Sequence, residues 1–156
     1  MPAFQRRNTS MKTFRIFLLG VFSLFFFSVA SRAADWQFFS ESPRGDYFYD
    51  ASGMKTISKN VIRVLVKLDI TPEECERWHA RFGEKYRDFS HEEELKEINC
   101  STKKARVISV TEYDENGEVI DRVHFGDTSG WDRIAPGTVN HALSKVVCKR
   151  QRAGKR

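Results

Sequence analysis

Apolar and polar residues alternate most regularly over residues 61–70. The charged residues of this segment share one parity, as the two faces of a β-strand require, and they are Arg63, Lys67 and Asp69. The other parity is apolar throughout and consists of Ile62, Val64, Val66, Leu68 and Ile70. The pattern therefore predicts a strand whose apolar face covers the core.

Five other segments favour strands because they combine apolar, aromatic or β-branched residues with flanking turn signals. They are residues 36–39, 46–50, 95–100, 105–113 and 118–124. Asn116-Gly117 separates the last two and is typical of a two-residue hairpin, since a type I′ turn needs positive φ at both positions. Residues 91–94 are acidic, and we expect them to be solvated.

A helix is predicted to begin after Thr71, with Pro72 at its first position and Glu74 completing a capping box. Its apolar residues recur every four positions on one stripe up to its expected end at Tyr86; they are Trp78, Phe82 and Tyr86.

Thr138 caps a second predicted helix, which carries an apolar stripe of Val139, Leu143, Val146 and Val147 and ends at Cys148. Together these elements predict an α+β fold. The expected architecture is an antiparallel β-sheet of five or six strands with one inserted helix and a C-terminal helix.

The first 33 residues have the three parts of a secretory signal peptide. Basic residues come first, and an uncharged run of 15 residues follows from Ile16 to Ala30. Small residues one and three positions before the cut predict cleavage after Ala33, with a cut after Ala30 as the alternative. Spanning a bilayer takes roughly 20 residues, which disfavours an uncleaved anchor. Met11 is an alternative start to Met1, because it opens a more compact leader.

Removal of this leader changes the charge balance. The whole chain has 26 basic and 21 acidic residues, but residues 1–33 hold five of the basic ones and none of the acidic ones. Five further basic residues lie in a tail at 149–156, so the body at 34–148 has 16 basic against 21 acidic residues. Such a body lacks the basic face that nucleic-acid binding needs, and we expect no nucleic-acid partner.

Export places the cysteines in a compartment where disulfides persist. The chain has three, Cys75, Cys100 and Cys148, and three cannot all pair within one chain. One disulfide and one odd thiol is the simplest arrangement. The odd thiol either stays free or pairs with a second copy of the chain to make a covalent homodimer.

Catalytic and metal-binding motifs are weak. Cys75 and His79 share one face of the predicted helix and could form a metal pair or a Cys–His dyad, but no third ligand or orienting carboxylate is implied nearby. Residues 114–118 resemble a calcium loop only superficially, because the glycine comes fourth instead of sixth, and a hairpin turn explains them better. We expect no catalytic residue, metal or cofactor.

Six aromatic residues lie close together near the start of the mature chain: Trp36, Phe38, Phe39, Tyr47, Phe48 and Tyr49. They could form a ligand-binding platform, since Tyr and Trp are common at binding surfaces. Strand alternation favours the core for most of them instead.

The order and spacing of several motifs between Asp35 and Cys148 resemble the surface-adhesin protein E-like family of small exported bacterial proteins. The motifs are Trp36, Tyr47-Phe48-Tyr49-Asp50, residues 61–67, Glu97-Ile98-Asn99-Cys100, residues 113–120, Trp131, Ile134, Pro136-Gly137-Thr138 and Val146-Val147-Cys148. The resemblance implies an antiparallel sheet with a C-terminal helix, a disulfide between Cys100 and Cys148, and a non-enzymatic role. Cys75 would then be a free thiol, and the family pattern does not call for it.

The leader and the resemblance predict an exported binding protein of the periplasm or outer surface, adhesin-like, with a protein or other macromolecular ligand. A periplasmic structural or assembly protein that docks an envelope partner is the alternative. An enzyme with a site assembled from distant residues is a third possibility. No stable membrane span is expected after cleavage.

Overall fold

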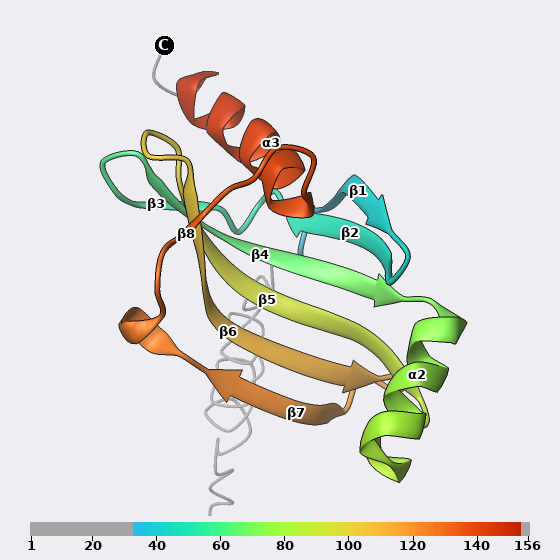
Figure 1. Cartoon of the computed structure of the whole chain (residues 1–156). Helices are drawn as coiled ribbons and strands as arrows, with labels where there is room; N and C mark the ends of the chain where they lie inside the picture. The colour runs from blue at the N-terminus through green and yellow to red at the C-terminus, as the bar shows by residue number, and fades with distance from the viewer. Residues whose placement is uncertain (1–32, 154–156) are drawn as a thin grey trace, which may run out of the picture. The chain divides into compact units, whose positions relative to one another are not determined.

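An antiparallel sheet forms the framework of the domain (Figure 1). The computed structural model describes residues 33–153, with side chains as far as Arg150. The predicted signal peptide lies outside the described residues apart from Ala33, so its cleavage stays a prediction. Within the described chain, no helix has the length and apolar character needed to cross a membrane.

The sheet follows the chain in the order β1-β2-β4-β5-β6-β7, with β3 beside β4 and β8 beside β6. Its strands are β1 Trp36–Ser42, β2 Gly45–Asp50, β3 Lys55–Ser58, β4 Val61–Ile70, β5 Phe89–Asn99, β6 Lys104–Asp114, β7 Val119–His124 and β8 Asp132–Arg133. The α+β prediction is confirmed, and β4 has the predicted bounds. Short β3 and β8 were not predicted, because each pairs over only a few residues.

Two helices and two short 3₁₀ turns complete the described chain: α2 Pro72–Phe82, η1 Glu84–Tyr86, η2 Gly126–Thr128 and α3 Val139–Ala153. Helix α2 ends four residues before the predicted end at Tyr86, because Gly83 has a positive φ of 86°. Helix α3 continues past Cys148, so Lys149 and Arg150, which we assigned to a tail, are helical. Both are good helix formers and suit a helix C-terminus.

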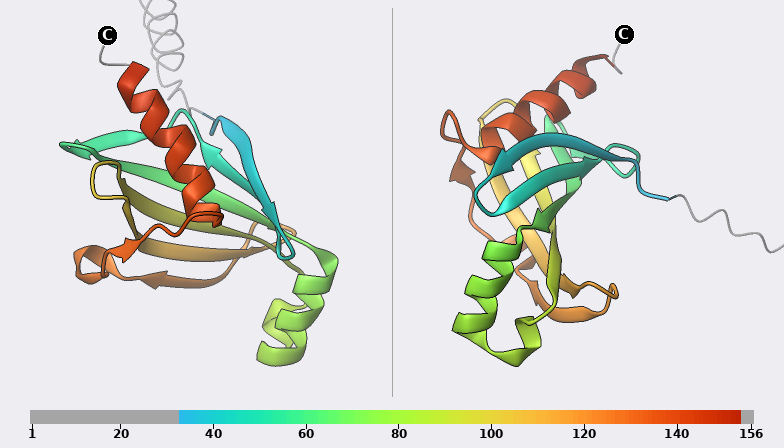
Figure 2. Two further views of the ribbon diagram at one scale, coloured as in Figure 1. Left: turned by 45° about the horizontal axis from the view of Figure 1, so that its top comes forward. Right: turned by 90° about the vertical axis from the view of Figure 1, so that its right-hand side faces the viewer.

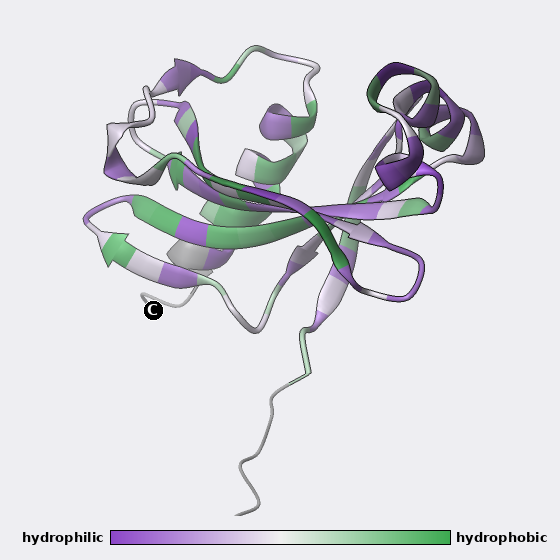
Figure 3. Cartoon of the chain, turned by 90° about the horizontal axis from the view of Figure 1, so that it is seen from below, coloured by the Kyte–Doolittle hydropathy of each residue, from purple (hydrophilic) through white to green (hydrophobic). Residues whose placement is uncertain are grey.

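The main core lies between α3 and one face of the sheet. Ile62, Val64, Val66 and Leu68 of β4 are buried there, as their alternation predicts, together with Leu143 and Val147 of α3. Figure 2 shows α3 crossing the sheet at one end while α2 lies at the other. In Figure 3, α2 is mainly hydrophilic with a few hydrophobic positions. The side chains of those few hydrophobic residues must therefore hold α2 against the sheet.

The acidic segment at residues 91–94 belongs to β5, so the expectation that it is solvated is wrong. Glu92 is only 7% exposed, and its carboxylate accepts a hydrogen bond from Arg44 at 3.2 Å. Burial raises the pKa of Glu92, the negative charge of Glu94 raises it further, and Arg44 opposes both. A cation from the β1–β2 turn therefore allows this acidic stretch to enter the sheet.

Candidate functional site

The first turn of α2 is held by an N-cap and by a salt-bridge network. Thr71 Oγ1 accepts the backbone N–H of Glu74 at 3.2 Å, as the predicted cap requires. A capping box also needs the Glu74 side chain to accept the backbone N–H of Thr71. That part of the prediction is wrong, because the Thr71 N–H donates to the Arg44 carbonyl at 3.0 Å. The Glu74 side chain is thereby available for other donors.

Glu74 is only 6% exposed and collects three side chains around its carboxylate. It accepts hydrogen bonds from Arg44 Nε at 2.9 Å, Arg77 Nε at 2.9 Å and Trp78 Nε1 at 3.0 Å. Burial alone would raise its pKa, but these hydrogen bonds outweigh burial and hold the pKa below the ordinary value. The charged carboxylate therefore fixes two guanidinium groups and an indole ring.

Four aromatic rings join α2 and η1 to the start of β5. The Trp78 ring centroid lies 4.9 Å from that of Phe82 and 5.1 Å from those of Tyr86 and Phe89. Tyr86 and Phe89 are buried, and the Tyr86 hydroxyl donates to Glu112 at 2.5 Å. Burial and this acceptor raise the pKa of Tyr86. The cluster explains how a mainly hydrophilic helix stays on the sheet.

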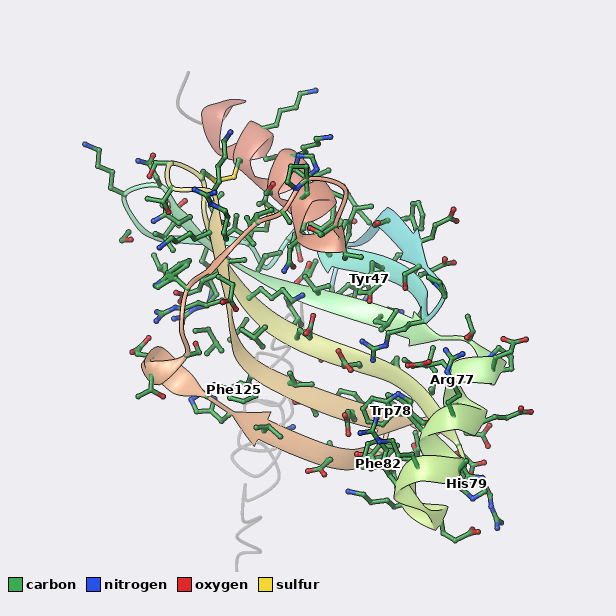
Figure 4. All side chains as sticks on the ribbon, in the orientation of Figure 1. Tyr47, Arg77, Trp78, His79, Phe82 and Phe125 are labelled. Carbon is green, nitrogen blue, oxygen red and sulfur yellow. A yellow bond between two sulfur atoms is a disulfide. The ribbon has the colours of Figure 1, made fainter. Side chains whose placement is uncertain are left out.

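The outer side of this cluster is exposed. An open hollow of about 590 Å³ is lined by Glu74, Arg77, Trp78, Arg81 and Phe82. Phe82 is 45% exposed, and the Arg81 guanidinium lies 5.0 Å from its ring centroid. Figure 4 shows Trp78 and Phe82 on the side of α2 that faces the sheet and His79 on the other. We call Arg77, Trp78, Arg81 and Phe82 the α2 surface.

The composition of the α2 surface suits protein recognition. Trp and Arg carry much of the binding energy at interfaces, and exposed aromatic rings supply apolar area. The predicted helix stripe contained Trp78 and Phe82, but Arg77 and Arg81 were not singled out. That Arg77 shares the Glu74 carboxylate with Arg44 depends on the fold. The sequence does show an arginine directly before each of the two aromatic residues, Trp78 and Phe82.

Cys75 and His79 use separate partners. The Cys75 thiol donates to the carbonyl oxygens of Arg87 at 3.3 Å and Tyr86 at 3.7 Å, whereas His79 Nε2 lies 3.3 Å from a Glu84 oxygen. The part of the chain that the structure describes contains no group of three or more His, Cys, Asp and Glu residues able to hold a metal ion. The geometry therefore gives the metal-pair hypothesis no support.

The disulfide joins Cys100, directly after β5, to Cys148 in α3, with their Cα atoms 5.7 Å apart. It has the pairing that the family resemblance implied, and Cys75 forms no disulfide within the chain. Whether Cys75 pairs with a second copy of the chain stays a prediction. Asp114 Oδ1 accepts the backbone N–H groups of Asn116 and Glu118 at 2.9 and 2.8 Å, so the suspected calcium loop is the hairpin turn between β6 and β7.

The six N-terminal aromatic residues divide between the two faces of the sheet. Tyr47 and Tyr49 are buried in the core, and the Phe39 ring centroid lies 6.1 Å from each of theirs. Trp36, Phe38 and Phe48 belong to the opposite face, where Lys67 Nζ lies 5.5 Å from the Trp36 ring centroid and 5.1 Å from that of Phe48. Phe38 is 56% exposed. Three of the six aromatic residues are therefore in the core, fewer than the majority that strand alternation predicted.

These features define a small, disulfide-bonded α+β domain with an exposed surface of arginine and aromatic side chains. Residues 36–149 match the family model of surface-adhesin protein E, and the chain belongs to that family. Among solved structures it is similar to that of Haemophilus influenzae protein E, with a TM-score of 0.49 and 12% sequence identity over 74% of this chain and 84% of that chain. A search of curated proteins found no match.

Proposed function

We propose that the protein is an exported, adhesin-like binding protein that holds a protein or other macromolecular ligand and catalyses no reaction. The observation that carries this proposal is the α2 surface, in which Phe82 is exposed beside Arg77 and Arg81. Family membership supports an adhesin-like role. The signal-peptide pattern of residues 1–33 supports export to the periplasm or the outer surface of a bacterial cell.

The α2 surface is ordered before a ligand arrives. Glu74 holds the Arg77 guanidinium and the Trp78 indole, and the Trp78 ring in turn contacts Phe82. Side chains fixed in this way lose little conformational entropy on binding. A suitable ligand offers an apolar group to Phe82 and acceptor oxygens to Arg81.

A binding assay with matched variants tests the proposal. Phe82→Ser removes an exposed ring from the α2 surface, and Phe38→Ser removes an exposed ring from the edge strand β1. The exported protein is immobilised and exposed to extracellular-matrix proteins, serum proteins and bacterial envelope extract. Loss of a central aromatic contact costs about 2 kcal/mol, or roughly 30-fold in affinity.

We expect Phe82→Ser to weaken binding of the captured ligand by that factor and Phe38→Ser to leave it unchanged. Equal affinity of the two variants and the wild type would contradict the proposal that the α2 surface binds the ligand. Arg81→Gln serves as a second variant that keeps the four aromatic rings of the cluster, because it removes only the guanidinium that lies 5.0 Å from the Phe82 ring centroid.

The cellular compartment separates the adhesin from the alternative, a periplasmic structural or assembly protein that docks an envelope partner. Protease added to intact cells should cleave a surface adhesin and leave a periplasmic protein whole. A ligand captured only from the envelope extract, together with protection from protease, would favour the alternative.

A further inference from the structure

A second hollow, of about 530 Å³, lies beside the disulfide at the end of the domain that carries α3. Its walls are the β5–β6 turn, the segment that precedes α3 and one side of α3, and the disulfide forms part of its lining. We call it the basic hollow. The α2 surface and the basic hollow share no lining residue.

The positive charges of the basic hollow come from two elements. Lys145 and Lys149 lie one turn apart on one stripe of α3, and the uncharged ring of His141 precedes them on the same stripe by a further turn. Lys103 reaches the hollow from the β5–β6 turn, where its φ is 52°. The Lys103 carbonyl accepts the Ile134 N–H at 3.0 Å, and this bond ties the turn to the segment before α3. The disulfide then fixes the turn against α3.

No carboxylate of the described residues lines the basic hollow. The ion pairs in the described part of the chain use other basic residues, such as Arg63, Lys96 and Arg106, and none of them includes Lys103, Lys145 or Lys149. Three ammonium groups without a counter-charge repel one another and raise the local concentration of anions. An anion in the hollow relieves this repulsion.

The other lining residues are suited to contact the uncharged part of a small organic ligand. Ile134 and Pro136 supply an apolar wall next to the disulfide. His141 Nδ1 accepts the Gly137 N–H at 3.1 Å, so the neutral ring carries its proton on Nε2 and can donate from there. A volume of about 530 Å³ lies within the range of small-molecule sites.

We propose that the basic hollow binds a compact oxyanion, namely a phosphate or sulfate monoester carried on a small body such as a sugar ring. Lys103, Lys145 and Lys149 neutralise the ester oxygens as point charges, a role that lysine fills at many phosphate sites. The body of the ligand rests against Ile134 and Pro136. This site is independent of the proposed adhesin-like function, because it uses other residues.

Titration of the exported protein at 50 mM NaCl tests the proposal. The probes are glucose 6-phosphate, sucrose octasulfate, inorganic phosphate, uncharged sucrose, and vesicles that contain an anionic phospholipid. Binding is followed by calorimetry and by NMR shifts of α3 amides. We expect the two charged sugars to bind more tightly than inorganic phosphate, and sucrose not to bind. Binding should weaken at 500 mM NaCl, where exposed charges are screened.

Charge-matched variants locate the site. Lys145→Gln and Lys149→Gln should each weaken binding by roughly two- to fivefold, as expected for one exposed charge. Arg122→Gln removes the same charge from β7, which pairs with residues 109–113 of β6, and should leave binding unchanged because Arg122 does not line the basic hollow. Thermal unfolding of each variant checks that the fold is retained.

Three results would overturn the proposal. The first is no binding of either charged sugar at 50 mM NaCl. The second is an equal loss in Lys145→Gln, Lys149→Gln and Arg122→Gln, which would indicate a diffuse effect of net charge. The third is binding to vesicles without binding to any soluble ester, which would assign the lysines to a membrane surface. Equal affinity for inorganic phosphate and glucose 6-phosphate would refute the role of the apolar wall.

Discussion

Removal of the disulfide should destabilise the domain more than any other change at its cysteines. Cys100 and Cys148 are 48 residues apart in sequence. Closing a loop of this length in the unfolded chain lowers its entropy by an amount worth roughly 4 kcal/mol, an upper figure since strain in the folded state is ignored. Domains of this size are typically stable by about 5–15 kcal/mol. We therefore expect the variant Cys100→Ala/Cys148→Ala to fold with a much smaller margin.

The variant should still fold, because α3 does not depend on the disulfide alone. Leu143 and Val147 have no exposed surface and pack against β4. The control is Cys75→Ala, which removes a thiol of intermediate exposure outside the disulfide. The loss of its single S–H donor, which two carbonyl oxygens share weakly, should cost less than about 1 kcal/mol.

The stability of each cysteine variant is measured on exported protein by urea and thermal unfolding. Tryptophan fluorescence and far-UV circular dichroism follow the transitions. A loss of about 4 kcal/mol corresponds to a Tm lowered by roughly 10–20 °C in a domain of this length. The wild type in reductant should approach the value of the double variant. Equal midpoints for the double variant and Cys75→Ala would refute the loop-closure reasoning.

Glu74→Gln should lower the urea midpoint at pH 7, and the difference from wild type should shrink as the pH falls below about 4.5, because a lowered pKa contributes stability only while the carboxylate is charged. Glu92 has a raised pKa, so its protonation stabilises the folded wild type as the pH falls. The urea midpoint of Glu92→Gln should therefore fall relative to that of the wild type as the pH falls, which is the opposite of the trend for Glu74→Gln. Midpoints measured between pH 3 and 7 distinguish the two variants. Leu143→Ala should cost about 2–5 kcal/mol by urea unfolding, because a fully buried side chain leaves a cavity. Mass spectrometry of the envelope fraction should find a mature N-terminus at Ala34, or at Ser31, and an intact Met1 or Met11 there would contradict cleavage.

The sequence predicted those parts of the fold that depend on local patterns. Residues 61–70 alternate without interruption, so both ends of β4 were correct. The start of β5 was missed because Glu92 is paired with Arg44, 48 residues away in sequence. When the burial of a carboxylate in a sheet depends on a cation that is distant in sequence, the neighbouring residues cannot predict that burial.

The same reason limits prediction of the α2 surface and the basic hollow. The aromatic stripe of α2 was visible, but the role of Glu74 as a hydrogen-bond acceptor depends on Arg44 from another turn. The basic hollow joins residues near 100 to residues near 145, and the disulfide, the Lys103–Ile134 backbone bond and the packing of α3 on the core bring them together. That pairing came from the family resemblance, since the residues alone left several pairings open.

The sheet order has a consequence for oxidative folding. Strands β5, β6 and β7 are neighbours in the sheet and are joined in the chain by short turns, and such strands pair early because closing a short loop costs little entropy. The 11 residues of β5, once extended, span roughly 35 Å. The Cys75 thiol bonds to Arg87 just before this strand, and Cys100 follows it. We therefore expect β5, once it has formed, to keep Cys75 away from Cys100 during oxidation, which favours the pairing of Cys100 with Cys148 in α3.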